Sequence, residues 1–267
     1  MISLDTKRMI YSFYVNDDSF EHPINKLHFK LLERYIHKFD EVIFCIIIDD
    51  RGRYDLIQRI EEFVISIFHK KLTFKIYDNT DYRESLVFYN EIATQIKNLD
   101  GYTFFGHNKG ISDVGSNYYI QMWVAAMYYF NLELDIALSA NNSNIFYGAL
   151  KTEGVNKCEE KFYDTIIPKH NWCYCGTFFW GKYQELHKLL EHRGEEIPSL
   201  TNRWYSELFP GEVTETNYGN CYKGLWILET MVTCDNIDKY LKSTYQKTAI
   251  DYYAFVDFFN NVLNELK

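Results

Sequence analysis

Strand-like and helix-like segments alternate between Met9 and Gly106, and this order restricts the fold more than any other feature of the chain. The strand-like segments are short and apolar, and they cover residues 9–15, 41–48, 72–77 and 102–106. The segments between them repeat apolar residues at helical spacing, which predicts helices from about residue 23 onward, over 56–67 and over 83–97. Because the connections are short and each helix is long enough for a crossover, we expect parallel strands joined by right-handed crossovers.

The predicted fold class is therefore α/β, with a mostly parallel central sheet related to the Rossmann arrangement. Residues 41–48 are apolar almost throughout, as in a strand that is covered on both faces, so we expect helices on both faces of the sheet. The second half of the chain is less regular. There we expect a strand at 145–150 and helices near 119–127, 182–191 and 251–266.

Length and charge narrow the class of protein. The 267 residues are enough for one large domain, and we expect a single domain over 1–267, with a regular half at 1–110 and an irregular half at 111–267 that ends in C-terminal helices. Acidic residues (37) outnumber basic ones (28), and the net charge of -9 argues against a nucleic-acid partner. No apolar run approaches the roughly 20 residues of a transmembrane helix, and the N-terminus lacks the apolar region of a leader peptide. Together with cysteines that fit free thiols, these features predict a cytoplasmic protein, in the host cytoplasm if the chain is viral.

Polar segments follow all four predicted strands, at residues 16–18, 49–53, 78–84 and 106–110. Ligands of parallel sheets bind outside the carboxyl ends of the strands, so these segments are the candidate ligand site. The sequence contains no P-loop, no glycine-rich dinucleotide fingerprint after the first strand and no G-x-S-x-G nucleophile elbow. The usual ATPases, the common dinucleotide dehydrogenases and the α/β-hydrolases are therefore disfavoured.

Two interpretations fit the loop at residues 78–84. Asp81 and Glu84 have the spacing of a capping box at the start of the next helix, which would account for both acids. Arg83 is then left beside a helix N-terminus on the ligand side of the sheet, and that combination favours an anion. Taken alone, the loop favours capping.

His107 and Lys109 directly follow the strand at residues 102–106. A polar turn with Gly110 at a positive φ would explain this pattern. Alternatively, both side chains face a bound diphosphate, where Lys109 would neutralise the charge of a leaving group. His107 would then bind a phosphate oxygen or a metal ion.

An aromatic stretch at residues 172–180 is interrupted by Gly176 and Thr177. Aromatic clusters belong to the core more often than to a site, yet a glycine within a strand often marks the close approach of a ligand. Farther along, Glu207 stands among the apolar side chains of residues 204–209. Partial exclusion of water would suit its carboxyl group to proton transfer.

In this order, the segments resemble a group of bacterial and viral glycosyltransferases related to the rhamnan synthesis F proteins. Members carry an N-x-G-R-[DE] loop before a helix, then a strand ending in H-x-K, a later G-T-x-F-W stretch and a downstream glutamate. The matching residues here are Asn79, Arg83, Glu84, His107, Asn108, Lys109, 176–180 and Glu207. The loop has no glycine before Arg83, and His107-Asn108-Lys109 stands where many GT-A enzymes hold Asp-x-Asp. The resemblance therefore leaves a divalent metal open, with His107 as a possible ligand, and a metal-free reaction is equally allowed.

The resemblance implies a GT-A-like glycosyltransferase that moves a sugar from a nucleotide-sugar donor to a glycan or glycoconjugate acceptor. Residues 1–110 would form the nucleotide-binding half and 111–267 the acceptor half. The donor-binding residues would be Tyr14, Asn16, Asp49, Asp50, Arg83, Glu84, His107 and Lys109. The acceptor would enter over Thr177, Trp180 and Trp204, and in an inverting reaction Glu207 would deprotonate its hydroxyl group.

Two other classes stay open. A non-catalytic nucleotide- or sugar-binding protein could use the same sheet, although a neutral glycan would not require His107 and Lys109. A nucleotidyltransferase would need a basic or glycine-rich loop after the first strand, and Asn16-Asp17-Asp18 is neither. The donor sugar, the linkage, the stereochemistry and the oligomeric state are not encoded in these patterns.

Overall fold

The computed structural model of the chain describes residues 6–16, 20–50, 52–108, 118–133, 145–149, 151–153, 169–170, 172–174, 177–215, 218–222 and 249–266. The strands are β1 (Lys7–Val15), β2 (Glu41–Ile48), β3 (Lys71–Asp78), β4 (Tyr102–His107), β5 (Phe146–Ala149), β6 (Lys151–Glu153), β7 (Trp172–Tyr174), β8 (Phe179–Gly181) and β9 (Tyr218–Tyr222). The α-helices are α1 (Pro23–Tyr35), α2 (Tyr54–Ile67), α3 (Glu84–Glu91), α4 (Tyr118–Tyr128), α6 (Tyr183–Arg193), α7 (Tyr205–Val213) and α10 (Ala249–Glu265). Short helices of other pitch are η1 (Ile36–Lys38), η2 (Ala93–Asn98) and η3 (Tyr129–Glu133).

Within the described residues, one seven-stranded sheet draws strands from both halves of the chain, in the order β3-β2-β1-β4-β8-β5-β9. The four strands β1 to β4 are parallel, with β1 between β2 and β4. β8 runs antiparallel to both β4 and β5, and β9 runs parallel to β5. The prediction of an α/β fold with a mostly parallel central sheet is confirmed.

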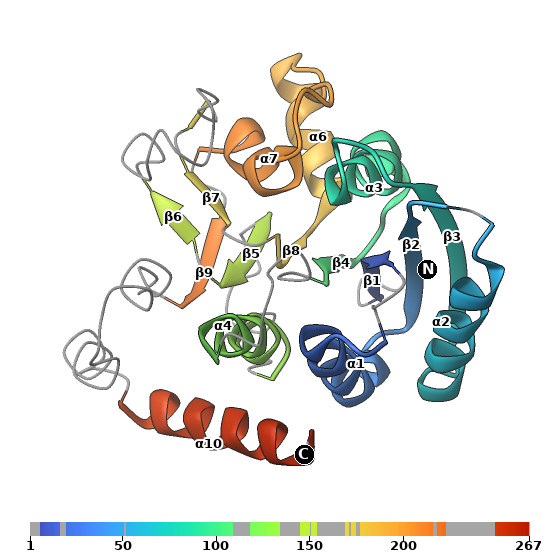
Figure 1. Cartoon of the computed structure of the whole chain (residues 1–267). Coiled ribbons are helices and arrows are strands. Elements are labelled where there is room, and N and C mark those ends of the chain that lie inside the picture. The colour runs from blue at the N-terminus through green and yellow to red at the C-terminus, as the bar shows by residue number, and fades with distance from the viewer. Residues whose placement is uncertain are drawn as a thin grey trace.

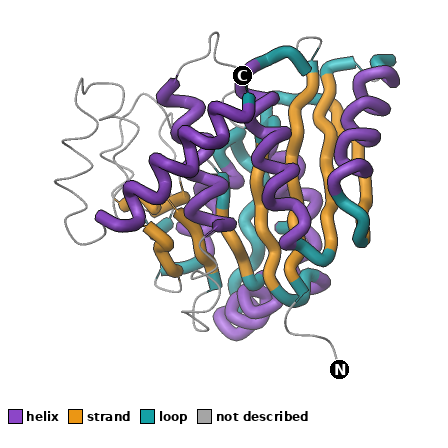
Figure 2. The backbone as a smooth tube through the Cα atoms, turned by 90° about the horizontal axis from the view of Figure 1, so that it is seen from below, coloured by secondary structure: helices purple, strands orange, loops and turns teal. Residues whose placement is uncertain are grey.

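Helices cover both faces of this sheet, as predicted (Figures 1 and 2). On one face, α1, α2, α4 and α10 share a core with Tyr11, Phe13 and Phe44 of the central strands. On the other face, α3, α6 and α7 pack over Ile10 and Phe105. The residues of β1 alternate between the two cores because successive side chains of a strand point to opposite faces. None of the described helices is both long and apolar enough to cross a membrane.

The helix predicted over residues 83–97 differs in detail. The structure has α3 followed by the 3-10 helix η2, and α3 begins at Glu84. Val87 and Phe88 are fully buried, whereas Leu86 and Tyr89 are only partly buried. A helix of two turns has too few residues for periodicity to define its face, so packing of Phe88 against the sheet decides its orientation.

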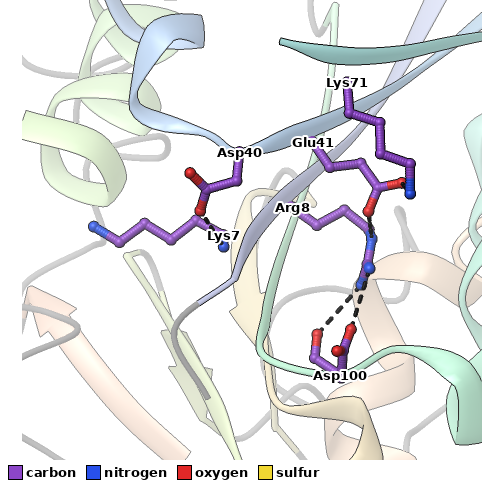
Figure 3. Close-up of polar contacts among 6 residues, drawn as sticks. All are labelled: Lys7, Arg8, Asp40, Glu41, Lys71 and Asp100. Carbon is purple, nitrogen blue, oxygen red and sulfur yellow. Dashed lines mark hydrogen bonds and ion pairs between the residues drawn. The ribbon is translucent and has the colours of Figure 1, made fainter. Parts of the chain in front are cut away.

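Charged side chains gather where the parallel strands begin (Figure 3). The Arg8 Nε donates to Glu41 Oε2 at 2.7 Å, and Lys71 Nζ lies 2.5 Å from Glu41 Oε1. The same guanidinium reaches Asp100, before β4, at 3.3 Å. We call Arg8, Glu41, Lys71 and Asp100 the amino-edge cluster. Burial alone would raise the pKa of Glu41, but the hydrogen bonds from Lys71 and Arg8 outweigh it, and the pKa of this carboxyl is lowered.

Candidate functional site

At the opposite edge, polar side chains from three neighbouring strands meet. The Tyr14 hydroxyl, near the end of β1, donates to Asp49 Oδ2 at 2.5 Å. Asn79, directly after β3, donates from Nδ2 to Asp49 Oδ1 at 2.8 Å. Both oxygens of the Asp49 carboxylate are thus held, and the side chain is fixed at the carboxyl end of β2.

Arg83 lies close enough to this trio to act on it electrostatically. Burial of Tyr14 and its hydrogen bond to Asp49 raise the pKa of the phenol to about 12, and the positive charge of Arg83 opposes that shift. The sequence therefore brings Tyr14, Asp49 and Arg83 together as predicted, although 69 positions separate Tyr14 from Arg83 in the chain. The role that these residues play in binding stays a prediction.

The backbone of Arg83 adopts an unusual conformation. Its φ of 48° and ψ of -130° lie where side chains are strongly disfavoured, and Thr177, with φ 60°, is the other non-glycine residue at positive φ among the described residues. Arg83 occupies the N-cap position of α3, and no side chain caps this helix. The capping-box interpretation of Asp81 and Glu84 is therefore wrong, because the chain turns at Arg83 and the helix starts later than the pattern assumed.

Glu84 and His107 form the next part of the site. His107 Nδ1, at the end of β4, lies 3.9 Å from Glu84 Oε1, close enough for an ion pair when the imidazole is protonated. Both side chains are largely buried, with an exposed fraction of 8% for His107 and 14% for Glu84. The neighbouring Asn108 has a structural role, since its side-chain amide hydrogen bonds with both the N–H and the C=O of Tyr14.

Glu207 is buried, at 3% exposed, in the first turn of α7. Its Oε1 accepts a hydrogen bond from Thr177 Oγ1 at 3.3 Å. Thr177 is fully buried, so its hydroxyl serves the carboxylate of Glu207 rather than a face open to solvent. The aromatic ring of Phe178, the next residue, lies 5.8 Å from the imidazole of His107, which puts this segment beside the Glu84–His107 pair.

The remaining predicted site residues are less closely connected. Trp204 is half-buried at the N-cap of α7, with the guanidinium of Arg203 4.4 Å from its ring. Asn16 is half-buried directly after β1, and Asp50 closes a turn by accepting the N–H of Gly52 at 2.7 Å. Lys109 lies outside the described residues.

Trp180 is in the core instead of at the ligand edge. It is 4% exposed, its ring stacks on Phe39 at 5.4 Å, and its Nε1 donates to the carbonyl of Asn131. This placement does not suit the acceptor contact expected of Trp180, because the indole is covered within the core that α1, α2, α4 and α10 form with the sheet. We leave it out of the proposed site.

A divalent cation would find limited support among the described residues. They contain no group of three or more His, Cys, Asp or Glu side chains arranged to hold a metal ion. Glu84 and His107 could supply two ligands, and phosphate oxygens of a substrate would have to complete the coordination. The donor set fits a substrate-bound cation better than one held by the protein alone.

Sequence reasoning omitted two residues that the structure joins to the site. Ser85 and Ser206 meet at 3.0 Å although 121 positions separate them. Nothing in the sequence around either serine signals that contact.

Comparison with known proteins gives only distant likenesses. No protein-family model and no curated protein matches the chain. The solved 4-diphosphocytidyl-2C-methyl-D-erythritol synthase from Anaerococcus prevotii is similar at 10% identity and a TM-score of 0.39, over 82% of this chain and 90% of that one. A mannosyltransferase from Pyrobaculum calidifontis, solved in complex with GDP-Man and Mn2+, is similar at 10% identity and a TM-score of 0.34. That match covers 80% of this chain and about half (53%) of the mannosyltransferase.

Proposed function

We propose that the chain is a glycosyltransferase that moves a sugar from a nucleotide-sugar donor to a glycan or glycoconjugate acceptor. In this proposal residues 1–110 bind the nucleotide and 111–267 receive the acceptor, within one domain. No nucleic acid takes part. We also propose that the chain is related to the glycosyltransferases of the rhamnan synthesis F group.

The observation that carries the proposal is the convergence of strain and charge at one edge of the sheet. Arg83 and Thr177 hold backbone conformations that cost on the order of 1–3 kcal/mol each, and such residues persist where the surrounding structure needs them, most often at functional sites. Arg83 directly precedes Glu84, whose side chain is partly buried, and Thr177 hydrogen bonds to the buried carboxylate of Glu207. A cation and carboxylates at the carboxyl ends of parallel strands suit a phosphorylated ligand and a proton transfer.

The chemistry assigns a step to each part of the site. Tyr14 and Asp49 would hold the nucleoside, and Arg83 would neutralise the diphosphate as the bond between the anomeric carbon and the phosphate oxygen breaks. In an inverting reaction, Glu207 would take the proton of the acceptor hydroxyl while that oxygen attacks the anomeric carbon. The products would be the glycoside and a nucleoside diphosphate. Glu84 would bind the donor sugar, and Trp204 would contact the acceptor.

The first experiment identifies the nucleotide. A thermal-shift screen with UDP, GDP, CDP and dTDP should single out one base, because a ligand at about 100 times its Kd adds roughly 2.7 kcal/mol of stability. The matching sugar nucleotides are then incubated with glycan acceptors, and the released product is analysed. Release of the nucleoside diphosphate supports glycosyl transfer, release of pyrophosphate from a nucleoside triphosphate indicates a nucleotidyltransferase, and binding without turnover indicates a binding protein.

A pair of matched variants tests where the nucleotide binds. Asp49→Asn replaces the carboxylate that joins Tyr14 and Asn79 with a neutral amide. We expect this change to abolish the thermal shift. Asp55→Asn changes an exposed carboxylate that pairs with Arg53 on α2 and should leave the shift intact. A full thermal shift in Asp49→Asn, equal to that of Asp55→Asn, would remove the Tyr14–Asp49 region from the proposed site.

A further inference from the structure

The helix that carries Glu207 lacks a cap of its own. Trp204 occupies the N-cap position of α7, and no side chain at that position hydrogen bonds to the first turn. Pro210 and Gly211 lie inside the helix, and neither residue favours helix. The orientation of the first turn therefore depends on contacts from elsewhere in the molecule.

A serine from another helix supplies the missing cap. Ser85, in the first turn of α3, accepts the backbone N–H of Ser206 on its Oγ at 3.1 Å. Ser206 is the second residue of α7, and its N–H is one of those that a side chain normally satisfies at a helix start. Ser85 thus does for α7 what an N-cap residue does within its own helix.

Proton counting fixes the direction of the other two hydrogen bonds. Ser85 Oγ lies 2.7 Å from the carbonyl of Arg203, which can only accept, so the single hydroxyl proton of Ser85 goes there. The contact of 3.0 Å between the two serine hydroxyls must then run from Ser206 to Ser85. Ser85 donates once and accepts twice, and its hydrogen-bonding capacity is fully used in a buried position.

Ser85 sits between the two halves of the candidate site. It directly follows Arg83 and Glu84 in the chain, and its partner Ser206 directly precedes Glu207. Packing keeps the two helices together around this contact, since the ring of Phe88 on α3 lies 5.1 Å from that of Phe209 on α7. One hydroxyl group therefore links the donor side of the site to the buried carboxylate.

We propose that Ser85 is a positioning residue, which caps α7 from α3 and thereby fixes Glu207 relative to Arg83 and Glu84. The inference rests on the proposed glycosyl transfer. Ser85 would touch neither donor nor acceptor, and it would act only through the placement of Glu207. Loss of Ser85 should then leave nucleotide binding unchanged and lower the rate of transfer.

The two serines offer a matched pair of variants. Ser85→Ala leaves the Arg203 carbonyl and both Ser206 donors without this partner, whereas Ser206→Ala removes one hydroxyl and keeps the cap on its N–H. We expect Ser85→Ala to lower kcat by about 10- to 100-fold with little change in nucleotide Kd, because small misplacements of a reacting group have effects of that order. Ser206→Ala should stay close to the wild type. Ser85→Cys, which keeps a weaker donor and acceptor, should fall between the two and carries the test if Ser85→Ala does not fold.

Amide hydrogen exchange gives a readout that does not depend on activity. The Ser206 amide should exchange several-fold faster in Ser85→Ala than in Ser206→Ala or the wild type. Equal kcat losses in both alanine variants, or a loss of nucleotide binding in step with kcat, would overturn the positioning role while the proposed function stands. A wild-type protein that transfers no sugar would overturn the proposed function and the positioning role together, whereas unchanged exchange at Ser206 would overturn the cap itself.

Discussion

The two edges of the parallel strands both carry charged side chains, but they hold them differently. At the amino edge, Arg8 and Lys71 pair with Glu41 at 2.7 and 2.5 Å, on ordinary strand backbone. At the carboxyl edge, Arg83 stands on backbone at φ 48°, and Glu84 lies 3.9 Å from His107, with which it forms an ion pair when the imidazole is protonated. The first arrangement satisfies its charges within the protein, and the second leaves charge and strain facing the ligand side of the sheet.

We expect this difference to separate the residues that stabilise the fold from those that serve the proposed function. Arg8 and Glu41 are buried and paired with each other, so loss of either one leaves an unpaired buried charge, which is costly. Strained backbone and exposed charge do not stabilise the fold, so they are retained where a ligand or a reaction uses them. Substitutions at the amino edge should therefore lower the stability of the fold and leave activity unchanged. Substitutions at the carboxyl edge should lower activity and leave stability unchanged.

The largest effect is expected for Arg83→Ala. Loss of the guanidinium should lower sugar transfer at least about 10³-fold, because it removes a cation that stabilises the departing phosphate. The melting temperature should not fall, since the side chain is exposed. Arg193→Ala is the control, because Arg193 is likewise an exposed arginine at one end of a helix, α6, and it lies outside the candidate segments. Near-normal turnover by Arg83→Ala would remove this residue from the site.

Glu41→Ala should have the opposite profile. Removing it leaves Arg8 without its closest partner, which should lower the free energy of unfolding by about 3 kcal/mol while kcat of the folded protein is unchanged. The pKa of Glu41 is lowered in the folded state, so its stabilisation is complete above its ordinary value of 4.5 and is lost as the pH falls through the folded value. Urea titrations of wild type and variant should therefore converge in acid. A parallel loss of activity would contradict the separation of the two edges.

Glu207→Gln keeps the shape of the side chain and removes the base. Transfer should slow by at least about 10²-fold, and nucleotide binding should match the wild type. Calorimetry with the nucleotide found in the screen, together with steady-state rates, separates the two quantities. An unchanged rate would mean that another group accepts the proton, with Glu84 the next candidate.

Arg83→Gly measures the strain itself. Glycine adopts positive φ without steric cost, although it also makes the unfolded chain more flexible, so Arg83→Gly should be more stable than Arg83→Ala by about 1 kcal/mol. Both variants should lack transfer activity. If Arg83→Gly is the less stable of the two by thermal unfolding, the backbone at residue 83 stores no strain.

The smallest effect is expected from removal of metal ions. The described residues hold no cluster of metal ligands, and the guanidinium of Arg83 can neutralise a diphosphate without a metal ion. Treatment with EDTA should therefore leave measurable transfer. Complete loss of transfer in EDTA and its recovery with manganese would show that Glu84 and His107 work with a substrate-bound metal.

The sequence by itself determined the order of the elements and the edge where the candidate site lies. The apolar run at residues 41–48 specifies a buried strand, and the apolar stripe over 56–67 specifies an amphipathic helix. Both patterns repeat within a few residues, so they can be recognised from the sequence alone. The direction of the strands follows from the crossovers, and the position of Tyr14, Asp49 and Arg83 at one edge follows from that direction. For this reason the first half of the chain was predicted more fully than the second.

Only the tertiary structure decided how the two halves meet. The contact of Ser85 with Ser206 spans 121 positions, and Trp180 lies in the core, where it stacks on Phe39. Neither outcome depends on the residues next to them in sequence. They arise from side chains that become neighbours only once the sheet has formed, and a local pattern carries no information about such partners.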